Sequence, residues 1–458
     1  MIPINSTKSA IEALEHEDAG VRYHGAWWLG KHRAVEAIPK LVECLKDERE
    51  VTSTGGYPLR RQAARSLGMI KNSSCIHSLL ETLNTDDVQL HEATLRALIE
   101  IKNDQCSHSL INYLNKDIHN KPIEALIEAL TANQVWQISE QIRPFLKSDS
   151  KRVVSSAATF FYGCTGDKSY LDQVIKLLNH ENRFVRQSAA FDLARIGTIS
   201  AAKPILAAEI PNNIKMYAIR AILSDSLLKS AKEENDQGAQ NQEVHDSLFK
   251  TLDELTRESF AGNLLIDQEI QTSSNSAQPL RSRAEILTNA FKKLGSPSLR
   301  EREEGIRLLT QSPESIKGDL HNLYFSESDQ DIKMGLVKAM AKLKDSDYIP
   351  ALIDAIGVEI GNHCQGNIRR VAACALGDID WILQDDCQSL TITMDKLSWT
   401  LQYPDDWGLR YSACIALEGI GNSRAKGLLL ESRAKEVDPV VSKRINIALS
   451  EMSISNVF

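Results

Sequence analysis

One short phrase recurs along the chain and constrains the fold more than any other feature. It consists of a β-branched residue or Leu, a basic residue, two variable positions, small residues, and then Leu-Gly or a close variant. Clear copies begin at Val21, Leu59, Val185, Ile368 and Leu409, and weaker ones near Val153, Ile214, Ile332 and Val441. Neighbouring copies lie about 30 to 40 residues apart, a period typical of stacked helical repeats.

Each copy of the phrase belongs to a pair of predicted helices. An acidic or Asn-rich break precedes the phrase, and a second apolar stretch such as 37–45 or 348–356 follows it. Pro in the first turn of these second stretches suits the start of a helix. Helical periodicity dominates and no alternating strand pattern is visible. The sequence therefore predicts an all-α chain, an α/α solenoid of helix-pair repeats.

The repeat is interrupted near the middle of the chain. Residues 232–243 and 271–279 are polar and poor in apolar side chains, as linkers are. Between them, Leu248, Leu252 and Leu255 have the spacing of one amphipathic helix. We therefore expect an N-terminal solenoid half over 1–228, a polar linker with one helix over 229–280, and a C-terminal half over 281–458.

Composition narrows the function. The chain has 458 residues, with 53 Lys and Arg against 61 Asp and Glu and a net charge of −8. A general nucleic-acid binder usually carries a basic face, so this balance disfavours one. No apolar run approaches the roughly 18–20 residues that cross a bilayer, and no secretory signal is recognisable. We expect a cytoplasmic protein with no membrane or nucleic-acid partner.

The cysteines and short motifs indicate no cofactor. Eight scattered cysteines form no Cys-x-x-Cys pair, and neither His-Glu-x-x-His nor a phosphate-binding Gly-x₄-Gly-Lys-Ser/Thr sequence is present. Reduced thiols in a cytosol are the expectation. We predict neither a metal site nor a nucleotide site.

The helical wheel separates two kinds of position in the phrase. The basic residue at position 2 lies near the buried seam, so we expect a structural ladder to acidic residues of the adjacent turn, formed by Arg22, Arg60, Arg186, Arg369 and Arg410. Positions 3 and 7 lie far from the seam. They hold Tyr23/Trp27, Arg61/Arg65, Gln187/Phe191, Arg370/Cys374 and Tyr411/Ile415. These pairs form either a binding surface or a face that other parts of the chain cover.

Arginines beside aromatic residues suit one class of ligand. Beyond the ladder, Arg61, Arg65, Arg183 and Arg370 are free for other roles. A planar guanidinium pairs with carboxylates and stacks on rings. The pattern indicates a flat, conjugated ligand that carries carboxylates.

Three segments resemble the phycobilin lyases with HEAT-like repeats: 57–68 (YPLRRQAARSLG), 25–41 (GAWWLGKHRAVEAIPKL) and 405–421 (DDWGLRYSACIALEGIG). In many of those enzymes two subunits cooperate. This chain resembles both subunits fused, the first over about residues 10–228 and the second over about 281–450. The resemblance implies a HEAT-like solenoid that handles a free bilin and a phycobiliprotein.

Residues 362–367 read Asn-His-Cys-Gln-Gly-Asn and match the motif of the lyase-isomerase branch of that family. The resemblance implies coupling of the bilin to a cysteine of a phycobiliprotein α subunit while a double bond migrates. Fused members resemble enzymes that convert phycoerythrobilin into bound phycourobilin, which favours phycoerythrin as client over phycocyanin. The alternatives are a plain lyase, a lyase-isomerase that turns phycocyanobilin into phycoviolobilin, and a non-catalytic scaffold.

The resemblance and the residue chemistry together give candidate roles. We expect His363 to move protons and Cys364 to assist as an acid–base group or transient nucleophile. The bilin is substrate, so no cofactor is expected. The candidate ligands of its lactam oxygens are Asn362, Gln365 and Asn367, and those of its propionates are Arg61, Arg65 and Arg370. Its rings would lie on Trp27, Tyr57, Trp407 or Tyr411. Its pyrrole N–H groups would donate to Asp378, Asp380, Asp405 or Asp406.

Overall fold

The computed structural model describes residues 4–53, 55–230, 238–259, 282–311, 313–357, 366–381, 387–403 and 406–454. Over these ranges every regular element is an α-helix or a short 3₁₀ helix, and none is a strand. The predicted all-α solenoid of helix-pair repeats is confirmed. None of the helices in these ranges has the length and apolar character that crossing a bilayer requires.

Contacts divide the chain into two compact units, Met1–Ile196 and Gly197–Phe458. The repeat phrase extends further, to about residue 228, and that was the basis of the predicted boundary. The contact boundary lies earlier because α14 (Asn212–Ser230) packs against α15 (Gly238–Thr256) and α26 (Pro439–Ile454) in the second unit. The expected helix through Leu248, Leu252 and Leu255 is α15, and all three leucines are buried.

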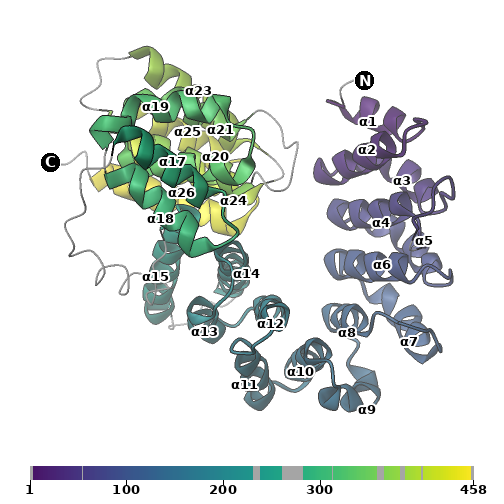
Figure 1. Ribbon diagram of the computed structural model, residues 1–458. Helices are drawn as coiled ribbons and strands as arrows, with labels where there is room; N and C mark the ends of the chain where they lie inside the picture. Colours follow the sequence, from purple (N-terminus) through teal and green to yellow (C-terminus); the bar gives the residue numbers. More distant parts are fainter. Residues whose placement is uncertain are drawn as a thin grey trace. The chain divides into compact units, whose positions relative to one another are not determined.

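The first unit stacks the longer helices of its pairs in one row. Each of α2, α4, α6, α8, α10 and α12 packs on the next member of the row, and α2 to α8 lie one below another in Figure 1. The α-helices are α1 (Thr7–Ala13), α2 (Ala19–Lys31), α3 (Ile38–Cys44), α4 (Pro58–Ile70), α5 (Ile76–Thr82), α6 (Val88–Ile101), α7 (Ser107–Asn115), α8 (Ile123–Ala132), α9 (Ser139–Ile142), α10 (Lys151–Thr165), α11 (Lys168–Leu177) and α12 (Arg183–Ile196).

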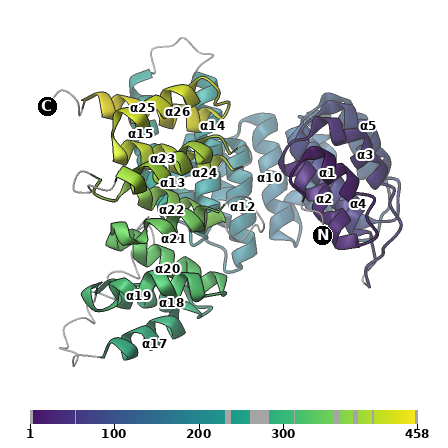
Figure 2. The same cartoon turned by 90° about the horizontal axis from the view of Figure 1, so that it is seen from above.

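The second unit repeats this arrangement from α18 to α26. Its helices α18, α20, α22, α24 and α26 pack in that order, and Figure 2 shows the succession from α17 to α26. The remaining helices of the unit are α13 (Ala202–Ala207), α17 (Arg283–Leu294), α18 (Leu299–Gln311), α19 (Pro313–Ser326), α20 (Gln330–Leu343), α21 (Ile349–Ile356), α22 (Gly366–Gly377), α23 (Cys387–Leu401), α24 (Trp407–Ile420) and α25 (Ser423–Arg433).

Short 3₁₀ helices are a recurring detail of both units. Most of them lead directly into the shorter helix of a pair. They are η1 (Val35–Ala37), η2 (Ser73–Cys75), η3 (Asp104–Cys106), η4 (Trp136–Ile138), η5 (Arg143–Lys147), η6 (Ile199–Ala201) and η7 (Ser346–Tyr348).

The acidic breaks and the small residues of the phrase have separate structural roles. The carboxylates of Asp18, Asp87 and Asp406 cap their helices by accepting the backbone N–H three residues on, at 3.0–3.1 Å. The small residues allow close packing of neighbouring helices. A Cβ on Gly68 would lie 2.7 Å from Cα of Ala97, and one on Gly377 would lie 2.4 Å from Cα of Ala416.

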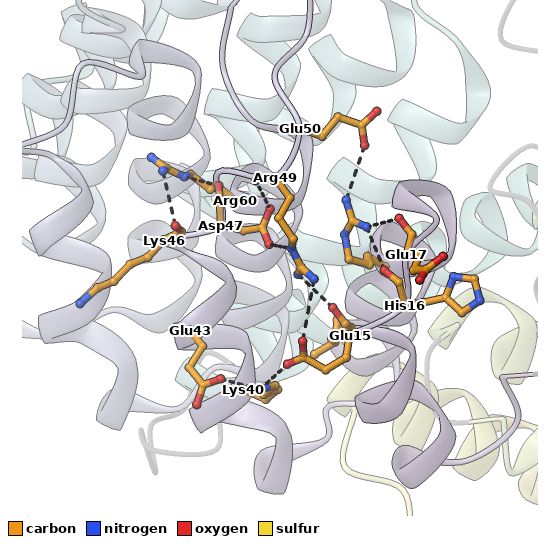
Figure 3. A network of polar contacts seen from close by, with 12 residues as sticks. Glu15, His16, Glu17, Lys40, Glu43, Lys46, Asp47, Arg49, Glu50 and Arg60 are labelled. Atoms are coloured by element: carbon orange, nitrogen blue, oxygen red, sulfur yellow. Dashed lines mark hydrogen bonds and ion pairs between the residues drawn. The ribbon is translucent and has the colours of Figure 1, made fainter.

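Most arginines at position 2 form a ladder as expected, but backbone carbonyls act as acceptors beside the acidic side chains that the sequence predicts. Arg22 donates to the carbonyls of His16 and Glu17 at 2.8 and 2.6 Å. Arg60 donates to the carbonyl of Asp47 at 2.7 Å and to the carboxylate of Glu48 at 2.7 Å. Figure 3 shows this network between neighbouring repeats. Both guanidinium groups are buried, so these bonds tie each repeat to the turn before it.

Candidate functional site

Helix α15 covers part of the face that positions 3 and 7 of the phrase would otherwise expose in the second unit. It packs against both α22 and α24. Tyr411 is fully buried, and its hydroxyl donates to the Asp253 carboxylate at 2.7 Å. Cys374 is also buried, which raises the pKa of its thiol to about 12. The expectation that Tyr411 offers its ring to a ligand is therefore wrong, because a helix of the same chain covers it.

The end of α15 and the residues just after it hold charged partners on this face. Asp253 accepts two hydrogen bonds from the buried Arg444 at 2.9 and 3.0 Å. Arg257 pairs with Asp378 at 2.5 Å. Asp378, a predicted ligand of pyrrole N–H groups, is therefore an ion-pair partner of α15. Asp380 lies exposed near the end of α22.

Arg370 lies beside the last residue of the six-residue motif. Its guanidinium donates to the side-chain oxygen of Asn367 and lies 3.6 Å from the carboxylate of Asp406, with its side chain only 13 % exposed. Gly408 leaves room for it, since a Cβ there would lie 2.9 Å from Cδ of Arg370. The structure brings Arg370 and Asn367 together, but Arg370 holds protein partners where a propionate was expected.

Trp407 retains a partly open ring at the start of α24. It is half-buried, meets Tyr411 edge-on at 6.1 Å between ring centroids, and lies under the Arg220 guanidinium at 5.3 Å. Arg220 is itself paired with Asp438. Trp407 is the predicted ring contact that stays accessible in this unit.

The centre of the predicted motif lies outside the described residues, but both of its flanks are described. Asn362, His363, Cys364, Gln365 and also Asp405 fall in the ranges that are not described. On the preceding side, the carbonyl of Ile356 accepts from Arg369 Nε at 2.5 Å and the carbonyl of Gly357 accepts from Lys396 Nζ at 2.5 Å. On the following side, Asn367 is bonded to Arg370.

The first unit places its four predicted ligands differently from one another. Trp27 is almost buried and stacks on His24 at 5.2 Å between centroids. The half-buried ring of Tyr57 faces the Arg60 guanidinium at 4.1 Å. Arg61 is half-buried and donates to Gln89, whereas Arg65 is exposed. Of these four, the two arginines of α4 are the groups best placed to meet a carboxylate.

Comparison with known proteins decides the family. A model of the PBS lyase HEAT-like repeat matches residues 21–47 and 59–85. The bilin biosynthesis protein PecE of Mastigocladus laminosus is 42 % identical over 258 residues, which are 55 % of this chain and 96 % of that protein. The chain belongs to the phycobilin lyase family.

Two further similarities concern other members of this family. The bilin biosynthesis protein PecF of Nostoc sp. (strain PCC 7120 / SAG 25.82 / UTEX 2576) is 38 % identical over 127 residues, 28 % of this chain and 73 % of that protein. A chain in the solved complex of CpcE and CpcF of phycocyanin lyase from Nostoc sp. PCC7120 is 32 % identical, with a TM-score of 0.48, covering 54 % of this chain and 96 % of that one.

This phycobilin lyase also contains a polar row around the buried carboxylates of Glu128 and Asp192, which the repeat phrase alone does not predict. Arg96 and Arg195 both lie beside Glu128, at 3.4 and 3.3 Å. Arg195 also pairs at 3.0 Å with the fully buried Asp192, which accepts from Ser155 at 2.5 Å. Burial raises the pKa of Asp192 to about 7 against the opposing effect of Arg195.

The sequence held one signal for this polar row. Asp192 occupies position 8 of its phrase, where the other clear copies have Trp28, Ser66, Ala375 and Ala416. A carboxylate at a seam position requires buried partners. The neighbouring arginines supply them.

Proposed function

We propose that this chain attaches phycoerythrobilin to a cysteine of a phycobiliprotein α subunit and isomerises it to bound phycourobilin. The observation that carries the proposal is the complete Asn-His-Cys-Gln-Gly-Asn sequence at 362–367 in a member of the phycobilin lyase family. Similarity to both PecE and PecF supports a single chain that combines two cooperating proteins. The client is phycoerythrin in this proposal, and the chain works in the cytoplasm.

The cysteines of the lyase support an acceptor thiol on the client. Cys44, Cys75, Cys106, Cys374 and Cys414 are buried, and burial raises their thiol pKa values to about 11 or 12. A thiol with so high a pKa supplies almost no thiolate near neutral pH, and the thiolate is the nucleophile. These five thiols are therefore poor nucleophiles, and in this proposal the attacking sulfur is that of the client.

The proposed chemistry consists of one thiolate addition and several proton transfers, with no redox step. The client thiolate adds to the ethylidene group on ring A, forming the C–S bond, and a proton completes the addition. Isomerisation then removes one proton at ring A and delivers one to the neighbouring methine bridge, so no oxidant or reductant is consumed. His363 suits both transfers because the ordinary pKa of imidazole lies near neutrality, with Cys364 as its assistant.

Described residues outside the centre of the motif have roles in this proposal. Arg370 holds Asn367 against Asp406, which fixes the first turn of α22. We assign Arg370 as a positioning residue for the motif. In the first unit, Arg61 and Arg65 are the groups available to a bilin propionate.

Three alternatives have observations in their favour. Relatives named phycocyanobilin lyase subunit alpha, such as that of Picosynechococcus sp. at 32 % identity, favour a plain lyase, and the bilin in their name favours the substrate of the phycocyanobilin-to-phycoviolobilin alternative. Helix α15 over the face of the second unit favours a scaffold, because it leaves less of that face open to a ligand.

Co-production of the chain and candidate α subunits with phycoerythrobilin, and separately with phycocyanobilin, tests the proposal. After denaturation and removal of free bilin, the client should absorb at the phycourobilin position, because one conjugated double bond is lost. Variants His363→Gln and Cys364→Ser should attach bilin that is not isomerised. Covalent phycoerythrobilin from the unmodified chain would indicate a plain lyase, and no adduct with either bilin would indicate the scaffold.

A further inference from the structure

Arg369 departs from the arginine ladder that the other clear copies share. In each of those copies a terminal guanidinium nitrogen reaches an acceptor: Nη1 of Arg22 and of Arg186 reaches a carbonyl at 2.8 Å, Nη2 of Arg60 reaches Glu48 at 2.7 Å, and Nη2 of Arg410 reaches Glu436 at 3.1 Å. Arg369 is 2 % exposed, and neither its Nη1 nor its Nη2 has a hydrogen-bond partner. Only its Nε is bonded, to the carbonyl of Ile356.

A second cation and two aromatic rings lie beside Arg369. Its guanidinium is 4.8 Å from the ring centroid of Tyr403 and 5.7 Å from that of Trp399. The ammonium of Lys396 is 4.6 Å from the ring of Trp399. The two rings are tilted against each other at 5.0 Å between centroids. No ion pair between a described carboxylate and either cation is present, so the described part of the cluster holds two cations without a directly bonded anion.

The unmade hydrogen bonds of the Arg369 guanidinium cost free energy. Buried guanidinium groups normally pair with an anion or fill their hydrogen bonds, and two unmade bonds leave a cost that a ligand can remove. Burial and the Arg369 guanidinium both lower the pKa of Lys396, and the carboxylate of Asp354 offsets them only in part. The nearby carboxylate of Asp354 already accepts from the hydroxyl of Tyr324 at 2.9 Å.

The cluster reaches the surface along α23, and its cations hold the backbone that precedes the motif in the sequence. Lys396 and Trp399 are half-buried, so a ligand can approach along α23. The carbonyls that the two cations hold belong to Ile356 and Gly357, the last described residues before the motif. A ligand at this cluster would thus lie close to the backbone of Ile356 and Gly357.

We propose that Arg369 and Lys396, with the rings of Trp399 and Tyr403, form a carboxylate site that binds a propionate of the bilin. The site rests on the proposed function, which supplies a conjugated ligand with two propionates. The planar edge of the guanidinium presents two parallel N–H groups to the carboxylate oxygens. The rings contact the adjoining conjugated part of the ligand, and Lys396 adds the second charge.

Titration of the full chain with phycoerythrobilin and with its dimethyl ester, followed by absorbance, tests this site. The unmodified chain should bind the acid about tenfold or more tightly than the ester, the effect of one charge-assisted pair. Arg369→Gln should weaken binding of the acid about tenfold and leave binding of the ester within about twofold. Lys396→Gln, which keeps a donor for the Gly357 carbonyl, should act in the same direction.

Arg186→Gln is the matched control, because Arg186 has the same phrase position and carbonyl acceptors in the first unit. It should retain the preference for the acid. Circular dichroism checks folding, and Lys396→Gln decides if Arg369→Gln does not fold. Equal loss of acid and ester binding, or no loss in either variant, would overturn the site while leaving the proposed function intact. Failure of the unmodified chain to bind either form would overturn the proposed function and the site with it.

Discussion

The carboxylate of Asp253 on α15 lies 2.7 Å from the hydroxyl of Tyr411 on α24, and it also accepts two hydrogen bonds from Arg444 on α26. One side chain from outside the repeats thus binds two neighbouring phrase helices. Tyr411 is fully buried and the side chain of Arg444 is 4 % exposed, so neither group has water as a substitute partner. We interpret α15 as a strap that fixes the face of the second unit.

Replacement of Asp253 tests the strap. Asp253→Ala removes the carboxylate acceptor of the buried Tyr411 hydroxyl and one of the two carboxylate partners of Arg444, the other being Glu418. Leaving a buried donor unsatisfied costs about 1–3 kcal/mol. Thermal or urea unfolding should show a loss of this order. The control is Asp246→Ala on the same helix, whose carboxylate accepts from exposed Gln242 and should matter by less than about 1 kcal/mol. Equal stability of the two variants would contradict the strap.

The contact between Arg370 and Asp406 leads to a prediction about product rather than stability. Asp406→Asn retains the cap of α24, since Asn also caps helices well, but removes the charge beside Arg370. We expect attachment to continue while the isomerised fraction of the client falls severalfold, as read from absorbance of the denatured client. Asp87→Asn, the same change at the cap of α6, should leave that fraction unchanged. A drop in both variants would assign the effect to helix capping alone.

The recurring phrase predicted the fold well because its period and its small residues directly reflect helix packing. The ladder arginines were also predictable, since a basic residue at a seam position needs buried acceptors. The burial of Tyr411 and the ion pair of Asp378 could not be predicted from the sequence, because both depend on where α15 packs. A helix outside the repeat has no periodicity from which its position can be predicted. The unmade hydrogen bonds of Arg369 likewise depend on the carbonyls and rings around it in the folded chain.

Small residues of the phrase provide a test of helix packing. Gly68→Ala introduces a methyl group 2.7 Å from Cα of Ala97 on the neighbouring helix. Overpacking of this kind typically costs about 1–3 kcal/mol, so the unfolding midpoint should fall. Gly427→Ala, on α25 with open space around its Cβ, should instead stabilise by up to about 1 kcal/mol. If Gly68→Ala were as stable as the unmodified chain, the helices would pack less closely than described.

The buried Asp192 should make stability of the first unit depend on pH. Its pKa rises on folding from an ordinary value near 3.8 to about 7, so the folded state holds a proton that the unfolded state releases. Its neutral form is therefore favoured by the fold, and the resulting stability is complete below about pH 4 and is lost as pH rises towards 7. Asp192→Asn cannot ionise, so the decline of stability with pH should be smaller in this variant, although it also loses the ion pair with Arg195.

Thermal unfolding at pH 5, 6, 7 and 8 measures the effect, and Asp104→Asn, at an exposed position, serves as control. Parallel pH profiles for Asp192→Asn and the unmodified chain would show that Arg195 keeps the carboxylate ionised in the folded state.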